Sequence, residues 1–174
     1  SATHGYVNTG STFTDSTRRV DHWSIEHLDV TTGAGDDRIE ATFNSWDKVN
    51  GGSGNDRWID SFSARTAALS VDMGLVSTNG GQSYADGTTV RNVEVASLTL
   101  TQGADTFRDF GAFNDNINGY DGDDDLGTSN GRDNMDGQSG TDTLTIDWAD
   151  ATEDAYVYNY SSTFGYVNTG STFS

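Results

Sequence analysis

Aspartate returns at an almost constant spacing within residues 103–144, each time followed two residues later by an apolar residue. The pairs are Asp105/Phe107, Asp115/Ile117, Asp124/Leu126, Asp133/Met135 and Asp142/Leu144. The aspartates are 10, 9, 9 and 9 residues apart, and a glycine lies two residues before four of them. A repeat this short is typical of a coil that alternates a turn with a short strand. Glycine turns that gather carbonyl and carboxylate oxygens suit calcium, which takes six to eight oxygen ligands.

The composition places the negative charge in turns. Of the 27 acidic residues 23 are Asp, against eight Arg and the single Lys48, and the formal net charge is −18. Asp is a poor helix former and a good turn residue. This charge would repel nucleic acid and anionic membranes, and it opposes a compact state unless a cation binds. We therefore expect a chain that depends on a bound metal ion to fold, with no nucleic-acid partner.

The absence of some residue types further restricts the folds and metal sites that this chain can form. The chain has no Cys, which excludes a disulfide framework and a thiolate metal site. It has no Pro, which suits continuous hydrogen-bonded ladders. No apolar run approaches the length of a membrane span, so we expect no membrane insertion.

Two internal repeats organise the chain. The nine residues GYVNTGSTF occur at 5–13 and again at 165–173, an offset of 160. We expect residues 1–174 to form one elongated module, holding one unit of about 160 residues and the start of the next in a tandem array. A second offset, of 68, aligns Asp37, Asp47 and Asp56 with Asp105, Asp115 and Asp124. The predicted parts are a first block at 20–62, connecting strands at 63–100, a second block at 101–148 and an inter-repeat segment at 149–174.

The clearest copy of the short repeat is GGSGNDRWI at 51–59, which fits the calcium-binding pattern G-G-x-G-x-D-x-U-x, where U is a large apolar residue. Weaker copies lie at 32–39, 119–126 and 137–144. In these motifs the chain resembles the RTX (repeats-in-toxin) family. The resemblance implies a parallel β-roll, calcium bound between turns two repeats apart, and export by a type I system. It implies these paired turns: Asp37 with Asp56, Asp105 with Asp124, Asp115 with Asp133, and Asp124 with Asp142.

We expect roughly four to six calcium ions per unit. The candidate ligands, through side chain or backbone carbonyl, are Thr32, Ala34, Gly35, Asp37, Gly51, Ser53, Gly54, Asp56, Gly103, Asp105, Asp115, Gly119, Asp121, Gly122, Asp124, Asn130, Gly131, Asp133, Gly137, Ser139, Gly140 and Asp142. Asp47 and Asp115 depart furthest from the motif, because Ser45 and Phe113 replace the glycine two residues earlier. We interpret their turns as spacers.

The predicted fold is all-β, a parallel β-roll of RTX type in two blocks with longer strands between and beside them. Alternating residues predict longer strands at 67–73, 93–100, 143–148 and 155–160, and only the segment 147–154 could be helical. The predicted interior ladder is Ile39, Val49, Trp58, Phe107, Ile117, Leu126, Met135 and Leu144.

Other sites compete with this interpretation. Residues 114–119 imitate an EF-hand loop, but its twelfth position would be Asp125 in place of Glu, and no helical period flanks it. His22 and His27 lack the spacing of a zinc-protease helix and are expected to be structural or exposed. Sugar rings could stack on Trp23, Trp46, Trp58, Trp148 and the tyrosines of 156–160, although core or inter-repeat packing explains these residues more simply. No nucleophile elbow, phosphate loop or carboxylate dyad is present, so we predict no enzymatic activity.

These observations predict a calcium-folded structural repeat module of a large extracellular or surface-attached bacterial protein, of the adhesin-stalk, filament or surface-layer type. Its expected partners are neighbouring copies of the same repeat, through end-to-end contact, and a cell-surface or polysaccharide ligand. The alternative is a calcium-dependent polysaccharide-binding or auxiliary module attached to a secreted enzyme, such as those of alginate epimerases. Ice binding is disfavoured, because the outward positions form no regular Thr/Asn array.

Overall fold

Short strands form because each glycine- and aspartate-rich turn is followed by a segment with one central apolar residue. In Arg38–Glu40, Ile39 is buried between two exposed neighbours. In Asn116–Asn118, Ile117 is buried between the exposed Asn116 and the half-buried Asn118. Successive side chains of a strand point to opposite faces, so a three-residue strand buries only its middle residue on one face. This repeated pattern produces sheets with an apolar inner side.

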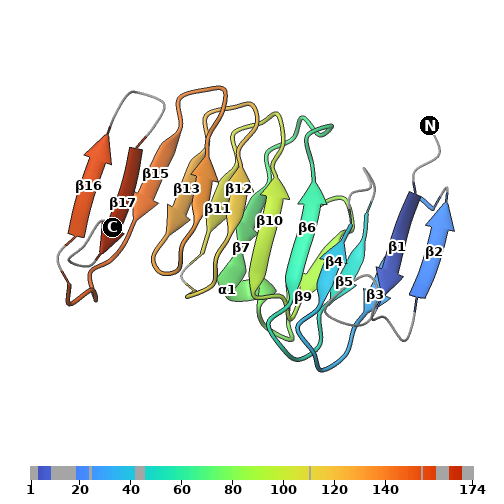
Figure 1. Ribbon diagram of the computed structural model, residues 1–174. Helices are drawn as coiled ribbons and strands as arrows, with labels where there is room; N and C mark the ends of the chain where they lie inside the picture. The colour runs from blue at the N-terminus through green and yellow to red at the C-terminus, as the bar shows by residue number, and fades with distance from the viewer. Residues whose placement is uncertain are drawn as a thin grey trace.

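A computed structural model (Figure 1) describes residues 4–8, 19–23, 25–41, 46–109, 111–153, 155–159 and 165–169. The strands, with one short helix, are β1 (His4–Asn8), β2 (Arg19–Trp23), β3 (Asp29–Thr31), β4 (Arg38–Glu40), β5 (Lys48–Asn50), β6 (Arg57–Ser61), β7 (Ser70–Asp72), α1 (Met73–Val76), β8 (Gln82–Ser83), β9 (Thr89–Arg91), β10 (Val95–Thr99), β11 (Thr106–Arg108), β12 (Asn116–Asn118), β13 (Asp125–Thr128), β14 (Asn134–Asp136), β15 (Thr143–Ile146), β16 (Ala155–Asn159) and β17 (Gly165–Thr169). The described chain is thus nearly all β, as predicted.

The strands from β3 to β15 form three sheets. Sheet 1 has the order β14-β12-β10-β6-β4, sheet 2 the order β15-β13-β11-β7, and sheet 3 the order β3-β5-β9-β8. Every pairing in them is parallel except that of β8 with β9. From β3 to β7 and from β9 to β15 the chain alternates between sheet 1 and the other two. Figure 1 shows these strands side by side in a long row, with the antiparallel hairpins β1–β2 and β16–β17 at its two ends.

The two aspartate-rich segments lie in one continuous sheet. β6, from the segment 20–62, pairs with β10, and β10 pairs on its other side with β12, from the segment 101–148. In register, Trp58 of β6 lies between Ile39 of β4 and Ala96 of β10. The strand β10 of the segment 63–100 is therefore part of the same stack.

A glutamine side chain links sheet 3 to sheet 2. Gln82 of β8 accepts a hydrogen bond from the Asp72 N–H at 2.9 Å through Oε1, and its Nε2 donates to the Ser70 carbonyl at 2.7 Å. A carboxamide carries the same donor and acceptor as a peptide unit. It therefore takes the place of a neighbouring strand's backbone beside β7.

The position of the helix differs from the sequence prediction. Residues 147–153 form turns and bends, while a four-residue helix, α1, follows β7 directly. Asp72 caps this helix, since its Oδ1 accepts from the Gly74 N–H at 2.8 Å. Met73 and Val76 of α1 are buried, which shows that packing on the core selects this segment.

The core lies between sheet 1 and the two sheets opposite. Six members of the predicted interior ladder are buried, namely Ile39, Val49, Trp58, Phe107, Ile117 and Leu126. Met135 is only half-buried, and the prediction for Leu144 is wrong because its side chain is 50 % exposed. Leu144 lies on β15, which has only β13 as a neighbour in its sheet, so that fewer side chains cover it.

Candidate metal centre

The turns between sheets gather on two edges of the stack. Edge A holds the turns that enter sheet 1, and edge B holds those that leave it. The predicted ligands on edge A are Thr32, Ala34, Gly35, Asp37, Gly51, Ser53, Gly54, Asp56, Asp115, Asn130, Gly131 and Asp133. Those on edge B are Gly103, Asp105, Gly119, Asp121, Gly122, Asp124, Gly137, Ser139, Gly140 and Asp142. The candidate residues thus divide into two separate rows.

Aspartates of stacked turns are joined by hydrogen bonds along each edge. On edge A the N–H of Asp37 donates to Asp56 Oδ1 at 2.8 Å, and that of Asp115 donates to Asp133 Oδ1 at 2.8 Å. On edge B the N–H of Asp105 donates to Asp124 Oδ1 at 2.8 Å, and that of Asp124 donates to Asp142 Oδ1 at 3.0 Å. The structure therefore brings together all four aspartate pairs that the resemblance implies.

Residues outside the motif extend these rows. Glu94 accepts from the Asp56 N–H at 2.9 Å, in the position that an aspartate occupies elsewhere. Asp47, interpreted from sequence as part of a spacer, accepts from the Leu28 N–H at 2.7 Å, and its own N–H donates to Thr88 Oγ1 at 3.3 Å. The offset of 68 residues aligns Asp47 with Asp115 in the sequence, whereas no local motif marks Glu94 or Thr88.

In four of these aspartates the second carboxylate oxygen is buried without a hydrogen-bond donor. They are Asp47, Asp56, Asp115 and Asp124, each at most 2 % exposed. Burial is the main cause that raises the pKa of all four carboxyls: to about 7 in Asp115 and to about 6 in the other three. A buried ionised oxygen without a partner is costly, and a bound cation removes that cost.

Glycine brings backbone close to these oxygens. A Cβ placed on Gly119 would overlap Asp124 Oδ2 and lie 2.8 Å from the Gly137 carbonyl oxygen, while one on Gly51 would lie 2.5 Å from Asp56 Oδ2. Gly140 has φ +146°, a conformation that other residues rarely adopt. The turns thus form small cradles of carboxylate and carbonyl oxygens that have no room for a methyl group.

Asp109, Asp115 and Asp133 form an acidic cluster that could hold a metal ion. One carboxylate oxygen from each residue lies within 4.8 Å of those from the other two, with Asp109 and Asp115 buried and Asp133 half-buried. A Cβ on Gly131 would overlap the Phe113 carbonyl, so this carbonyl points at the next turn as the Gly103 carbonyl does toward Gly122. The turn of Asp115, interpreted from sequence as a spacer, therefore has carboxylate and carbonyl groups that could hold a metal ion. Asp109 was missed because it lies at the start of the turn, outside the nonapeptide.

Some predicted ligands already have partners within the chain. Both carboxylate oxygens of Asp105 are hydrogen-bonded: Oδ1 accepts from the Leu69 N–H and Oδ2 from the Thr101 N–H, each at 2.6 Å. The Thr32 hydroxyl donates to the Gly51 carbonyl. These residues close the turns, whereas each of the four aspartates above keeps a buried oxygen without a donor.

An alanine scan of two glycines tests the cradle on edge B. Gly119→Ala is expected to weaken metal binding at this turn by roughly tenfold, because its methyl group takes the space beside Asp124 Oδ2. Gly35→Ala is the control, since nothing lies within 4 Å of a Cβ there. Calcium titration of both variants measures the difference. Equal loss, or no loss, in the two variants would show that the cradle on edge B holds no ion.

Asp60 of β6 is a buried acid inside the core, 3 % exposed. Burial raises its pKa to about 8, an effect that Asp47 reinforces and Arg65 opposes. The unfolded carboxyl titrates near pH 3.9, so between about pH 4 and pH 8 the folded state binds more protons. The contribution of Asp60 to stability is therefore lost as the pH rises through that window.

Asp60→Asn is expected to flatten the pH dependence of stability by up to about 1.4 kcal/mol per pH unit. The carboxamide keeps an oxygen for the Ser61 N–H, which Asp60 Oδ1 accepts at 2.7 Å. Urea unfolding between pH 5 and pH 9 in saturating calcium measures the slope for parent and variant, so that the contribution of bound metal cancels in their difference. Asp29→Asn is the control, because the Asp29 side chain is exposed. A slope for Asp60→Asn equal to that of the parent would contradict a neutral Asp60 in the folded state.

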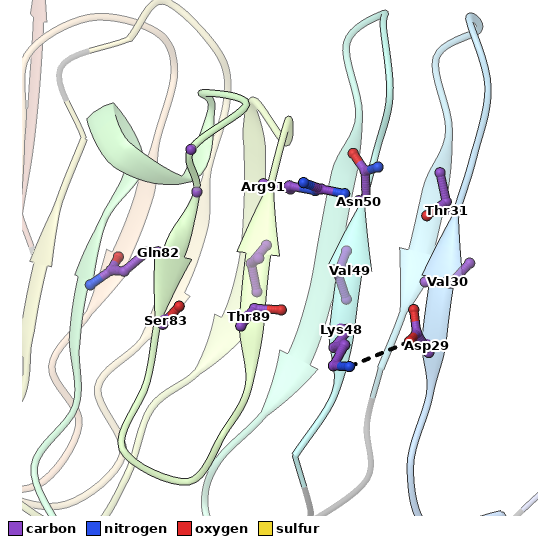
Figure 2. Close-up of a pocket in the computed structure, with 13 residues that line it drawn as sticks. Asp29, Val30, Thr31, Lys48, Val49, Asn50, Gln82, Ser83, Thr89 and Arg91 are labelled. Carbon is purple, nitrogen blue, oxygen red and sulfur yellow. Dashed lines mark ion pairs between the residues drawn. The ribbon is translucent and has the colours of Figure 1, made fainter.

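A shallow hollow lies on the outer side of sheet 3 (Figure 2). It is lined along β3, β5 and β9 by polar side chains that include Thr31, Asn50 and Arg91. Lys48 lies in the same hollow and pairs with Asp29 at 3.7 Å. This surface faces away from the core and is separate from the two edges of turns.

Comparison with protein-family models, with curated proteins and with solved structures finds no match to this chain. Among the described residues, no helix has the length and apolar character needed to cross a membrane.

Proposed function

We propose that this chain is a calcium-binding structural module of RTX type, in which parallel strands form a β-roll and calcium ions bind between stacked turns. The single observation that carries the proposal is the set of buried aspartate oxygens without donors, at Asp47, Asp56, Asp115 and Asp124. The available ligands are all oxygens, and calcium prefers six to eight of them at about 2.3–2.6 Å. Carbonyls at the glycine turns supply the neutral ligands.

Asp109, Asp115 and Asp133 would hold one ion on edge A, because three carboxylates converge there. On edge B, Asp124 Oδ2 and the Gly137 carbonyl face the space beside Gly119. Bound calcium would neutralise the negative charge of these carboxylates. The raised pKa values of Asp115 and Asp124 also mean that binding near pH 6 to 7 is coupled to proton release.

The repeat at an offset of 160 residues supports a structural role in a tandem array. Extracellular calcium, at millimolar concentration, suits modules of this kind, whose dissociation constants are about 10⁻⁴–10⁻³ M. We therefore place the module in a secreted or surface-attached bacterial protein that folds after export. In this role it acts as a stiff spacer and has no catalytic site.

Asp115→Asn tests the proposal at one site. The carboxamide keeps an acceptor for the Ala96 N–H, which Asp115 Oδ1 accepts at 2.7 Å, while the charge is lost. We expect the variant to lose one calcium ion, and the stabilisation by calcium to fall by about 1.4 kcal/mol at ten times the dissociation constant. In chelator the variant should keep at least as much strand content as the parent, since a buried charge is removed.

The matched control is Asp29→Asn, which removes the same charge from an exposed side chain on the outer face of β3. Calorimetric titration of both variants gives the number of ions bound. The same number of ions in Asp115→Asn as in the parent would contradict the assignment of Asp115 as a ligand.

The hollow of Figure 2 favours a second candidate function, the binding of an acidic polysaccharide in a module attached to a secreted enzyme. Arg91 offers a cationic group, and Thr31 and Asn50 offer hydrogen-bonding groups, while Lys48 of the same hollow is paired with Asp29. Arg91→Ala should then reduce retention on an immobilised acidic polysaccharide in calcium buffer. Absence of any retention of the parent chain would exclude this function for the hollow.

A further inference from the structure

The duplicated sequence forms a strand at both of its positions, but with different partners. Residues 5–8 lie in β1, which pairs with β2, and the identical residues 165–168 lie in β17, which pairs with β16. Both pairings are antiparallel. The same sequence thus pairs with the following strand in its first copy and with the preceding strand in its second copy.

The two hairpins place a valine opposite the valine of the shared sequence. Val7 lies opposite Val20 in the first hairpin, and its counterpart Val167 lies opposite Val157 in the second. If a single strand had both partners, its valine would be flanked by a valine on each side. Cross-strand pairs of β-branched residues are favourable in antiparallel sheets, so the valine row favours each of the two pairings.

The two hairpins lie at opposite ends of the row of strands (Figure 1). A strand has two hydrogen-bonding edges, and each hairpin of this chain occupies one edge of its copy of the shared sequence. A joint in which one copy of the sequence holds both partners therefore requires β16 and β2 to occupy different edges of that strand.

We propose that the duplicated sequence is the joint between neighbouring copies, as the central strand of a three-stranded antiparallel sheet. One edge pairs with β16 of one copy and the other edge pairs with β2 of the next copy. The partner is thus a second copy of this repeat, recognised by backbone hydrogen bonding to a strand edge. This inference rests on the proposed role as a repeat module and specifies how units of that module connect.

Strand exchange between separate chains tests the joint. Tyr6→Pro/Val7→Pro disables β1, because adjacent N–H groups point to opposite edges and proline removes both. The unpartnered β2 should then accept β17 of another chain. Tyr166→Pro/Val167→Pro disables β17, and the unpartnered β16 should accept β1 of another chain. The quadruple variant lacks the shared strand altogether and serves as the matched control.

Mass is measured by size-exclusion chromatography with light scattering, in calcium, for the full chain and the three variants. We expect each two-residue variant to reach about two or more chain masses, while the parent and the quadruple variant stay at one. The joint is refuted if the two-residue variants remain at one chain mass. It is equally refuted if the quadruple variant associates as they do, because association would then follow from disrupted hairpins alone.

Calcium titration of the same four proteins, followed by circular dichroism, separates the two proposals. A calcium response in all four, with single-chain mass in the two-residue variants, rejects the joint and leaves the calcium module intact. A parent chain without a calcium response rejects the calcium module, whatever the masses are.

Discussion

Transfer from calcium to excess chelator is expected to lower the free energy of unfolding by several kcal/mol. The chain carries a formal net charge of −18, and four of its aspartates bury an oxygen without a donor. With free calcium ten times above the dissociation constant, each site adds about 1.4 kcal/mol. Several sites together rival the whole stability of a domain, about 5–15 kcal/mol. In chelator we therefore expect a chain that is largely unfolded.

Thermal and urea unfolding, followed by circular dichroism in calcium and in chelator, measure this loss. Magnesium at the same concentration is the control for ionic strength, because it requires octahedral geometry and retains its waters, so that cradles made for calcium bind it weakly. Equal strand content and equal melting temperature in calcium and in chelator would contradict calcium-dependent folding.

Trp58→Ala is expected to cost about 3–5 kcal/mol of stability, the largest effect of any single substitution proposed for this chain. Trp58 is fully buried in β6, at the strand that connects the two aspartate-rich segments. Its ring lies 5.8 Å from that of Phe62 and 6.3 Å from that of Tyr84, between centroids. Its small neighbour in register, Ala96, cannot fill the space left by truncation.

Trp46→Ala is the matched control, since Trp46 is 37 % exposed and stacks on His27 at 4.1 Å. This change should cost about 1 kcal/mol or less. Urea unfolding of both variants in saturating calcium gives the two free energies. A similar cost for the two tryptophans would show that sheet 1 does not depend on packing at the junction of the two segments.

Local spacing predicted much of the fold, because each short strand is specified by its own turn and its central apolar residue. Ile117 and Leu126, for example, are buried as the nine-residue period predicts. The direct pairing of β6 with β10 could not be predicted, since it depends on long-range packing around residues 62–94. The same holds for Gln82, whose carboxamide replaces a strand neighbour beside β7.

The candidate site was predicted where the motif is regular and missed where it is not. Asp124 and Asp142 were paired correctly because both lie in nine-residue repeats. Asp109 was not predicted, since only the path of the ten-residue turn brings it beside Asp115. Leu144 was placed wrongly in the interior because the period carries no information on how many neighbours cover a strand.

The number of calcium ions bound by each chain tests the central claim most directly. Equilibrium dialysis against buffered calcium, at neutral pH and low protein concentration, measures it without reference to folding. The buried aspartate oxygens on the two edges predict saturable binding of roughly four to six ions, with dissociation constants of about 10⁻⁴–10⁻³ M or tighter. No saturable binding at millimolar calcium would contradict the claim.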